Sequence, residues 1–359
     1  MKIVVDINHP AHVHYFKNFI WEMEQRGNNI LITASQKDIS FDLLNAYEFK
    51  YVPLGSYGKT IYNKIINIPK LDLRMYNAVK EFDPDLFLGF GSIRAAHISK
   101  LMKKPCISLD DSEPAIWEHL LYVPFSDYIL TPLCFKKNFG YKHIKYDGFT
   151  ELAYLHPNYF KPDSRILSDI GIDEQETFFV LRFVSWNAGH DLGQRGLIDK
   201  KMLIEELEKH GKIIISSEGP LEIGLEKYRM KLAPEKMHDL LFYSKLLIGD
   251  SQTMTTEAGV LGTPAIRCNT FVGAKDMGNF IELEKKYGLI FNYNNFKNAF
   301  NKLKELVRNP NLKNEWKTKR DRLLADKIDL TAFLIWLIEN YPESFQEAKR
   351  DSKIAQNFR

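Results

Sequence analysis

Cysteine is scarce in this sequence. Only Cys106, Cys134 and Cys268 occur among the 359 residues, far apart, and no Cys-x-x-Cys pair is present. This pattern excludes a zinc knuckle and a disulfide framework, because both need several regularly spaced cysteines. A reducing compartment is the simplest setting for so few and so scattered thiols.

Long apolar runs and an excess of one charge are also absent. The best membrane-spanning candidate, residues 120–135, is interrupted by Pro124, Asp127 and Pro132. The net charge is only +3, with basic residues spread along the chain, which gives no case for nucleic acid as a partner. The chain enters an expected strand at once, so no signal peptide is expected and the sequence predicts a cytoplasmic protein. Contact with the inner face of the membrane stays an open alternative.

Short apolar runs alternate with amphipathic helical patterns throughout, which is typical of an α/β fold with parallel sheets. The length and the 45% hydrophobic content suggest two domains, each with its own core. The expected strands of the first half are residues 3–7, 29–33, 50–52, 86–90, 105–109 and 128–130. Those of the second half are residues 177–184, 212–216, 245–249, 264–267 and 289–291. The clearest helical patterns cover residues 13–26, 93–103, 294–308, 312–325 and 330–340.

The most informative segment runs from Leu246 to Ile266. An apolar strand ends at Gly249, small polar residues follow, and a short helix begins that carries one acid, Glu257. A helix N-terminus at a strand end offers backbone N–H groups and a positive dipole to an anion, usually phosphate. The residues expected to hold the phosphates are Ser251, Gln252, Thr253, Met254 and Thr255. The competing interpretation is an ordinary strand–helix unit whose hydroxyl residues only cap the helix.

This segment resembles the donor site of GT-B glycosyltransferases and of UDP-N-acetylglucosamine 2-epimerases. The resemblance implies that the turn holds the diphosphate of a UDP-sugar and that Glu257 binds the ribose. It also implies two doubly wound Rossmann-like domains with an interdomain cleft. The UDP-sugar would be a substrate, with no separate cofactor and no metal ion. An uncharacterised bacterial and archaeal family with a His-Pro-Ala-His loop is similar as well.

Under this resemblance the chain divides into five parts. Residues 1–150 form an acceptor-side Rossmann-like domain, residues 151–173 a linker, and residues 174–325 a nucleotide-sugar-binding Rossmann-like domain. Residues 326–342 form a helix that crosses back toward the first domain. Residues 343–359 are polar, and we expect a loosely held tail.

Three histidines, His9, His12 and His14, crowd the loop after the first strand. The segment resembles the first loop of the N-acetylglucosaminyltransferase that completes the peptidoglycan lipid precursor, and His12 falls at that family's histidine. The glycines of that loop are replaced here by Asn8, Pro10 and Ala11. An imidazole can take a proton from an acceptor hydroxyl, so His12 is a candidate base, and His9 and His14 would line the substrate. A metal site and plain helix capping are the alternatives.

Two further turns follow strands of the first half. Residues 108–114 carry Asp111 and Glu113, which resemble the acid–base segment of the epimerases, although Ser112 to Pro114 could equally start a helix. Residues 89–94 hold Gly91 and Ser92, which would line the substrate pocket. A lone Gly-x-Gly is weak evidence for a nucleotide loop.

The second half adds three candidates for the nucleotide sugar. Arg182 and His190 lie in or next to a long polar loop after its first strand, and Arg267 follows a later strand. A guanidinium can bind phosphate in a bidentate manner. The alternative for Arg182 is an ion pair within the sheet.

The resemblance favours a metal-independent GT-B glycosyltransferase that moves a sugar from a UDP-sugar to a hydroxyl acceptor. The acceptor would be a glycan or a lipid-linked precursor in cell-envelope or capsular polysaccharide biosynthesis. A UDP-sugar 2-epimerase, a UDP-sugar hydrolase and a non-catalytic nucleotide-sugar-binding protein are the alternatives. Residues 57–66, apolar with scattered lysines, could touch a membrane or form a plain surface helix.

Overall fold

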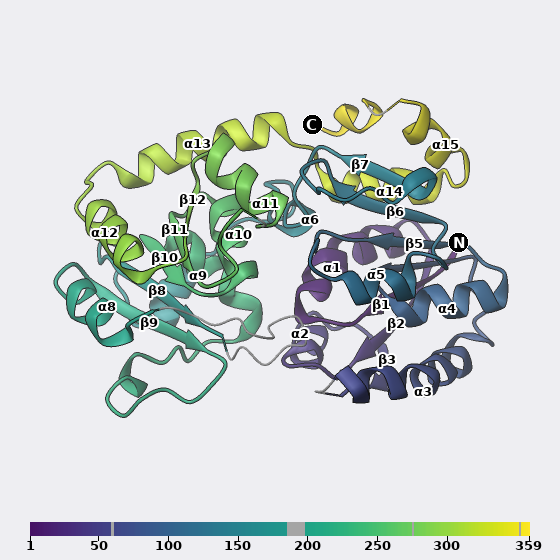
Figure 1. Ribbon diagram of the computed structural model, residues 1–359, viewed down its shortest axis with the longest axis horizontal. Coiled ribbons are helices and arrows are strands. Elements are labelled where there is room, and N and C mark those ends of the chain that lie inside the picture. Colours follow the sequence, from purple (N-terminus) through teal and green to yellow (C-terminus); the bar gives the residue numbers. More distant parts are fainter. Residues whose placement is uncertain (59–60, 185–197, 275, 352) are drawn as a thin grey trace. The chain divides into compact units, whose positions relative to one another are not determined.

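The chain folds into two compact units. The computed structural model describes residues 1–58, 61–184, 198–274, 276–351 and 353–359. The first unit contains residues 1–159 and 326–359, and the second contains residues 160–325 (Figure 1). The boundary between the units therefore falls at Tyr159 and Phe160, inside the segment expected to be a linker. In the part of the chain that the structure describes, no helix is long and apolar enough to cross a bilayer.

The first unit is built on a sheet of seven parallel strands in the order β3-β2-β1-β4-β5-β6-β7. The chain runs outward from β1 to β3 and then continues from β4 on the other side of β1, so the strand order reverses between β1 and β4. Ligands of doubly wound sheets bind beyond the carboxyl ends of the strands at such a reversal. The strands are β1 (Lys2–Ile7), β2 (Asn29–Ser35), β3 (Tyr51–Gly55), β4 (Leu86–Phe90), β5 (Cys106–Leu109), β6 (Tyr128–Pro132) and β7 (His143–Tyr146).

Helices connect these strands and cover the sheet, because most of the strands are apolar on both faces. In β4, for example, all five residues are buried. The helix α14 packs against α1 and α6, so the final part of the chain belongs to the first unit. The helices are α1 (Pro10–Gln25), α2 (Ser40–Ala46), α3 (Ile61–Val79), α4 (Ile93–Met102), α5 (Ile116–Tyr122), α6 (Leu152–Leu155), α14 (Leu330–Glu339) and α15 (Glu343–Arg350), with short 3-10 turns η1 (Gly140–Lys142) and η6 (Ile354–Phe358).

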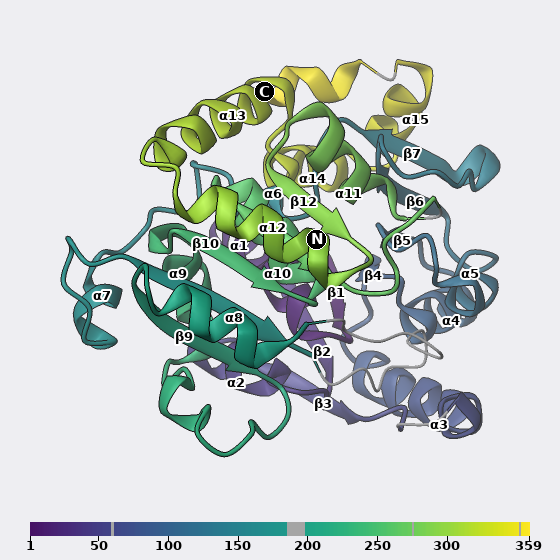
Figure 2. The ribbon, with the colours of Figure 1, turned by 60° about the vertical axis from the view of Figure 1, so that its left-hand side comes forward.

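The second unit has a sheet of five parallel strands in the order β12-β11-β10-β8-β9. Its strand order reverses between β8 and β10. The helices α8 and α12 contact each other on one side of the sheet, and α9 and α10 contact each other on the other side (Figures 1 and 2). The strands are β8 (Phe178–Phe183), β9 (Lys212–Ser217), β10 (Leu246–Gly249), β11 (Ala265–Cys268) and β12 (Ile290–Tyr293). The helices are α7 (Arg165–Asp169), α8 (Lys200–Leu207), α9 (Met237–Tyr243), α10 (Gln252–Leu261), α11 (Gly278–Ile281), α12 (Phe296–Val307) and α13 (Leu312–Asp326), with the short turns η3 (Glu226–Tyr228), η4 (Pro234–Lys236) and the π-helical η5 (Glu282–Lys286).

The α/β class and the two doubly wound sheets confirm the predicted fold. The expected tail is a correction. Residues 343–359 form α15 and η6, and the Phe345 side chain is fully buried with its ring centroid 4.3 Å from that of Tyr128. The reason is that Ser344, Phe345 and Ala348 recur at helical spacing, which gives this polar segment one narrow buried face.

Candidate functional site

The start of α10 lies at the strand-order reversal of the second unit, directly after β10. The N-cap is Ser251, whose Oγ accepts the N–H of Met254 at 3.4 Å. The hydroxyl of Thr255 donates to the Ser251 carbonyl at 2.6 Å. Met254 and Thr255 are buried, whereas Gln252 and Thr253 are part-exposed. The positive end of this helix is therefore presented at its first two residues, where an anion could reach it.

Two residues before that helix fix where it begins. A Cβ atom at Gly249 would lie 2.4 Å from the Arg182 carbonyl oxygen, so only glycine allows β8 and β10 to approach so closely here. Asp250 is buried; its Oδ1 accepts the Val184 N–H at 2.9 Å, and its carbonyl accepts from the Asn269 amide at 2.9 Å. Asp250 thus ties the ends of β8, β10 and β11 together.

Glu257 lies in the second turn of α10, as the sequence places it. Its side chain is only 5% exposed, and its Oε1 is 3.0 Å from Nε2 of His238 on α9, which is also buried. A buried carboxylate beside an imidazole is held in one orientation by that contact. His238 is therefore part of this site, although it was not among the residues predicted from the sequence.

The two arginines expected near the phosphates are engaged elsewhere. Arg182 donates to the Ser216 hydroxyl at 2.8 Å and forms an ion pair with Glu218, so the alternative of a pair within the sheet describes it. Arg267 is fully buried, paired with Asp276, and its guanidinium lies 3.5 Å from the centroid of the Phe280 ring. Burial lowers the pKa of Arg267. His190 lies outside the described residues.

In the first unit, a buried ion pair occupies the strand-order reversal between β1 and β4. Asp6 and Arg94 are both fully buried, with Arg94 Nη2 2.7 Å from Asp6 Oδ1. Asp6 also accepts hydrogen bonds from Thr33 at 2.6 Å, Ser92 at 2.5 Å and the Asn8 amide at 2.8 Å. Every carboxylate oxygen is thus satisfied, as a buried charge requires. This hydrogen-bond network holds Asn8 in place at the start of the loop that follows β1.

That backbone controls His12. The Asn8 N–H donates to Nδ1 of His12 at 3.3 Å, which places the proton of the neutral ring on Nε2. Burial, with the charges of Lys37 and Arg94, lowers the pKa of His12 to about 3, although Asp6 opposes the shift. The ring is therefore neutral at physiological pH, and its Nε2 carries an N–H donor rather than a lone pair. This geometry favours a hydrogen-bond donor over the general base that the sequence suggested.

The other predicted residues of the loop and the glycine turn have mainly structural contacts. His9 caps α1, its Nδ1 accepting from Ala11 at 3.2 Å. His14 is buried, and its ring stacks on Tyr154 with centroids 5.4 Å apart. Ser92 is buried and caps α4, while Gly91 has a φ of +51°, which glycine adopts without strain. Of these four, His9 and Gly91 are part-exposed.

The acidic turn after β5 separates into a buried and an accessible carboxylate. Asp110 is buried and accepts from His119 at 2.7 Å and from Tyr122 at 2.5 Å. Asp111 is part-exposed, and its pKa is raised well above the ordinary value by burial and by the neighbouring charges of Glu151 and Asp110. A part-exposed carboxyl group whose pKa is raised by its surroundings is typical of acid–base sites.

Glu113 stands apart from this pair in its contacts. Its Oε1 accepts the backbone N–H of Lys136 at 3.2 Å. Its contact helps to hold the segment between β6 and β7 against the turn. Among the residues that the structure describes, no three His, Cys, Asp or Glu side chains are arranged to hold a metal ion.

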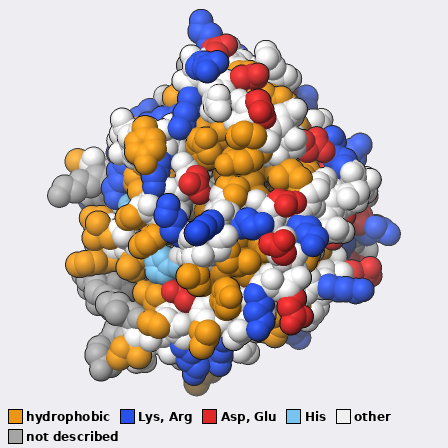
Figure 3. All heavy atoms as spheres, turned by 90° about the vertical axis from the view of Figure 1, so that its right-hand side faces the viewer, with side chains coloured by type: hydrophobic (Ala, Val, Ile, Leu, Met, Phe, Trp, Pro, Cys, Tyr) orange, Lys and Arg blue, Asp and Glu red, His pale blue; other side chains and the backbone are white. Residues whose placement is uncertain are grey.

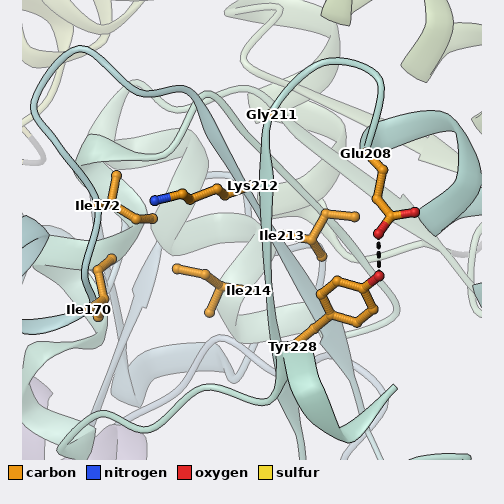
Figure 4. A pocket seen from close by; sticks show the side chains of 8 residues that line it. All are labelled: Ile170, Ile172, Glu208, Gly211, Lys212, Ile213, Ile214 and Tyr228. Atoms are coloured by element: carbon orange, nitrogen blue, oxygen red, sulfur yellow. Dashed lines mark hydrogen bonds between the residues drawn. The ribbon is translucent and has the colours of Figure 1, made fainter. Parts of the chain in front are cut away.

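A hollow elsewhere on the second unit lies away from these strand ends. It has a volume of about 370 Å³ and lies at the beginning of β9 (Figure 4). Lys212, on its wall, already donates to the Gly171 carbonyl at 2.9 Å, and Tyr228 is hydrogen-bonded to Glu208. Ligands of doubly wound sheets bind at the carboxyl ends of strands, so we assign this hollow no role. Its lining residues are Ile170, Ile172, Glu208, Gly211, Lys212, Ile213, Ile214 and Tyr228.

Comparison with known proteins places these features in a family. The description "Protein of unknown function (DUF354)" matches residues 1–330. The chain belongs to the DUF354 family. A relative, the uncharacterized protein MJ0665 of Methanocaldococcus jannaschii, is 24% identical over 281 residues, covering 75% of this chain and 82% of the relative.

Solved structures show the same fold at low identity. UDP-GlcNAc 2-epimerase from Neisseria meningitidis, bound to UDP-GlcNAc, is similar with a TM-score of 0.63 and 12% identity, over 97% of this chain and all of that one. A glycosyltransferase of Streptomyces sp. SF2575, complexed with thymidine diphosphate, is similar with a TM-score of 0.61 and 12% identity, over 94% of this chain and 99% of the other. These similarities confirm the expected GT-B fold, with two Rossmann-like domains.

Some of the predicted residues follow the carboxyl ends of strands in each unit, whereas Arg182, Arg267 and Glu113 have partners elsewhere. In the second unit, residues 251–257 form the N-cap and first turns of α10. In the first unit, His12 follows β1 and Asp111 follows β5, with β4 between these two strands. The sequence analysis assigned no role to Arg94, Glu151, His238 or Asp250. Asp6, a carboxylate inside an apolar strand, was considered only as a possible neighbour of the histidine loop in the metal-site alternative.

Proposed function

We propose that this DUF354 protein is a GT-B glycosyltransferase that moves a sugar from a UDP-sugar to a hydroxyl acceptor. The observation that carries the proposal is the start of α10 at the β8–β10 reversal, with Gln252 and Thr253 part-exposed and Glu257 two turns in. This arrangement suits a diphosphate at the helix end. The known structures with this fold include ones bound to UDP-GlcNAc and to thymidine diphosphate, which supports a nucleotide-sugar substrate.

In this proposal the backbone N–H groups at Gln252 and Thr253 hold the diphosphate, and Glu257 binds the ribose hydroxyls. His238 keeps the Glu257 carboxylate in place through its 3.0 Å contact. The helix end would also stabilise the negative charge that develops on the departing nucleotide. Because Arg182 and Arg267 are already paired with carboxylates, we assign neither as a direct phosphate ligand.

Asp111 is the proposed base for the acceptor hydroxyl. A carboxylate whose pKa is raised binds a proton more strongly than an ordinary one, so it is better suited to remove the hydroxyl proton as the new bond forms. His12 would donate a hydrogen bond from Nε2 to substrate rather than accept a proton. The acceptor in this proposal is a glycan or lipid-linked precursor of the cell envelope or capsule.

A second candidate is a UDP-sugar 2-epimerase or hydrolase. The observation that favours it is that the neighbouring charge of Glu151 raises the pKa of Asp111, which indicates two interacting carboxylates that need no bound acceptor. Such a pair can remove and return protons on one substrate. A nucleotide-sugar sensor would need the α10 site but not this pair.

Incubation of the purified protein with UDP-sugars separates these candidates. Release of UDP only when an acceptor extract is added supports transfer. A change in the sugar or free UDP without an acceptor supports epimerisation or hydrolysis, and binding with no turnover in either case supports a sensor. Parallel reactions with EDTA test whether the chemistry needs a metal ion; we expect full activity, because the proposed site holds the diphosphate by backbone groups.

A further inference from the structure

One helix of the first unit turns an apolar stripe outward. On α5 the exposed fractions are 59% for Ile116, 72% for Trp117 and 61% for Leu120. These positions share one face of the helix, while His119 and Tyr122 on the opposite face are buried and bonded to Asp110. The outward stripe is therefore not needed to pack α5. Figure 3 shows one face of the molecule, on which hydrophobic side chains (orange) are exposed in several places.

The stripe continues onto neighbouring segments. Phe125 follows α5 and is 38% exposed, and Leu133 and Tyr141, between β6 and β7, are 56% and 79% exposed. The Lys142 ammonium donates to the Val123 carbonyl at 3.2 Å, so the β6–β7 segment lies against the end of α5. We call these six residues the α5 surface: Ile116, Trp117, Leu120, Phe125, Leu133 and Tyr141.

Lysines gather in the segment that forms the β6–β7 part of the α5 surface, whereas α5 itself carries Glu118 and the exposed Asp127 follows it. Residues 128–146 contain four lysines and no aspartate or glutamate. Lys136 is exposed, and the Lys349 ammonium lies 5.7 Å from the centroid of the Tyr141 ring. Exposed tryptophan, leucine and tyrosine beside lysines suit the boundary between lipid headgroups and acyl chains, where apolar side chains insert and cations meet anionic headgroups.

We propose that the α5 surface binds the surface of an anionic membrane. A second copy of the chain is the competing occupant. It fits less well, because a two-fold contact would bring the same lysines of both copies together. The membrane adds a partner to the proposed function, since a lipid-linked acceptor resides at such a surface. Lipid binding needs no substrate, so this proposal and the proposed function can fail separately.

Co-sedimentation with vesicles tests the proposal. The full chain should sediment with phosphatidylcholine vesicles that contain phosphatidylglycerol, bind pure phosphatidylcholine weakly, and be released as salt is raised. The affinity of the double variant Trp117→Ser/Leu120→Ser for the anionic vesicles should be lower by about tenfold or more, because two inserting side chains are lost. Ile223→Ser, at a fully exposed position of the second unit, is the matched control and should bind like the unchanged protein.

Three results would overturn the proposal. The first is no sedimentation with anionic vesicles at low salt, and the second is equal binding by the double variant. The third is that analytical ultracentrifugation shows a dimer, which the double variant dissociates, while no lipid binding is seen. If circular dichroism shows that the double variant misfolds, quenching of tryptophan fluorescence by brominated lipids is measured instead. The unchanged protein should be quenched, and most of this quenching should be lost in Trp117→Phe. UDP titration of the same proteins reports the nucleotide site independently.

Discussion

At the residue scale, hydrogen-bond direction decides what His12 can do. Position alone makes it a candidate base, since it follows β1 at the strand-order reversal. The Asn8 N–H occupies Nδ1, and burial, Lys37 and Arg94 lower the pKa of the ring to about 3. A ring with that pKa is a poor proton acceptor at neutral pH, but it is a constant hydrogen-bond donor.

His12→Gln should therefore keep more activity than His12→Ala, because the glutamine amide can still donate. Both variants should keep the same pH dependence of kcat between pH 5 and 8, since His12 does not titrate there. If kcat of the unchanged protein rises with a pKa near neutrality and both variants lack this rise, His12 is the base. Steady-state kinetics of the three proteins with the accepted UDP-sugar provide the measurement.

The same pKa predicts an effect on stability. Below its ordinary pKa of 6.5, the unfolded chain protonates His12 while the folded chain does not, so this residue's contribution to stability is lost as pH falls toward about 3. His12→Gln removes that contribution. The difference in unfolding free energy between the two proteins, from urea titrations, should thus be smaller at pH 4.5 than at pH 7.

The contribution of Asp111 to stability depends on pH in the opposite direction to that of His12. The raised pKa of Asp111 means that the folded chain keeps the carboxyl proton to a higher pH than the unfolded chain does, so stability is lost as pH rises through the folded pKa, above which the carboxylate is ionised and can act as a base. Asp111→Asn should abolish turnover and raise Tm, and the gain in Tm should be larger at pH 8 than at pH 4. Each kcal/mol would correspond to a shift of about 2–4 °C in a folding unit of the size of the first unit, to which Asp111 belongs. The exposed Glu81→Gln is the control, and an equal gain at both pH values would refute the coupling.

At the scale of elements, the proposed nucleotide site depends on where β10 stops. The strand has four residues, all buried, and the chain turns at Gly249 and Asp250 into α10. This much is local, so the sequence could predict it from a run of apolar residues, a glycine and a hydroxyl N-cap. The closeness of β8 to Gly249 is not local and had no sequence signal.

Gly249→Ala tests this element. Its Cβ would meet the Arg182 carbonyl oxygen, so β10 must shift, at an expected cost of about 1–3 kcal/mol. The shift would move the start of α10. UDP affinity should therefore fall even under conditions in which the Gly249→Ala protein is fully folded. Gly219→Ala is the matched control, because nothing lies within 4 Å of its added Cβ. Unchanged UDP affinity in a folded Gly249→Ala protein would show that the helix start is not the binding site.

At the scale of the whole molecule, the end of the chain completes the first unit. The Asp329 N–H donates to the Phe358 carbonyl at 2.7 Å, and the Phe358 ring packs 5.4 Å from that of Phe333. The Lys327 ammonium, which is almost fully buried, lies 2.7 Å from an Asp147 carboxylate oxygen. These contacts join segments far apart in the chain and give η6 a structural role.

Ending the chain after Lys353 should destabilise the first unit by about 2–4 kcal/mol, since it removes aromatic packing and one buried hydrogen bond. UDP affinity should stay the same, because the proposed nucleotide site lies wholly in the second unit. Calorimetric unfolding with and without UDP measures both. Gln356→Ala, at an exposed position, is the control. A large loss of UDP affinity on truncation would contradict independent roles for the units.

Across the molecule, the sequence predicts what is local. Most strand limits were predicted within one or two residues, because parallel strands are short apolar runs between helical patterns. The edge strand β7 was missed, since His143 and Lys145 alternate with its two buried residues. The ion pair of Asp6 and Arg94 joins residues 88 positions apart, and the partnership of Asp111 with Glu151 also needs the fold. No pattern along the chain could reveal either.

Calorimetric titration of the full chain with UDP tests the central claim most directly. We expect measurable heat with one site per chain, lost in Glu257→Ala and weakened in His238→Ala, while Glu235→Ala, at a part-exposed position of the nearby turn η4, binds normally. Absence of heat with UDP, or binding that Glu257→Ala leaves unchanged, would contradict the account.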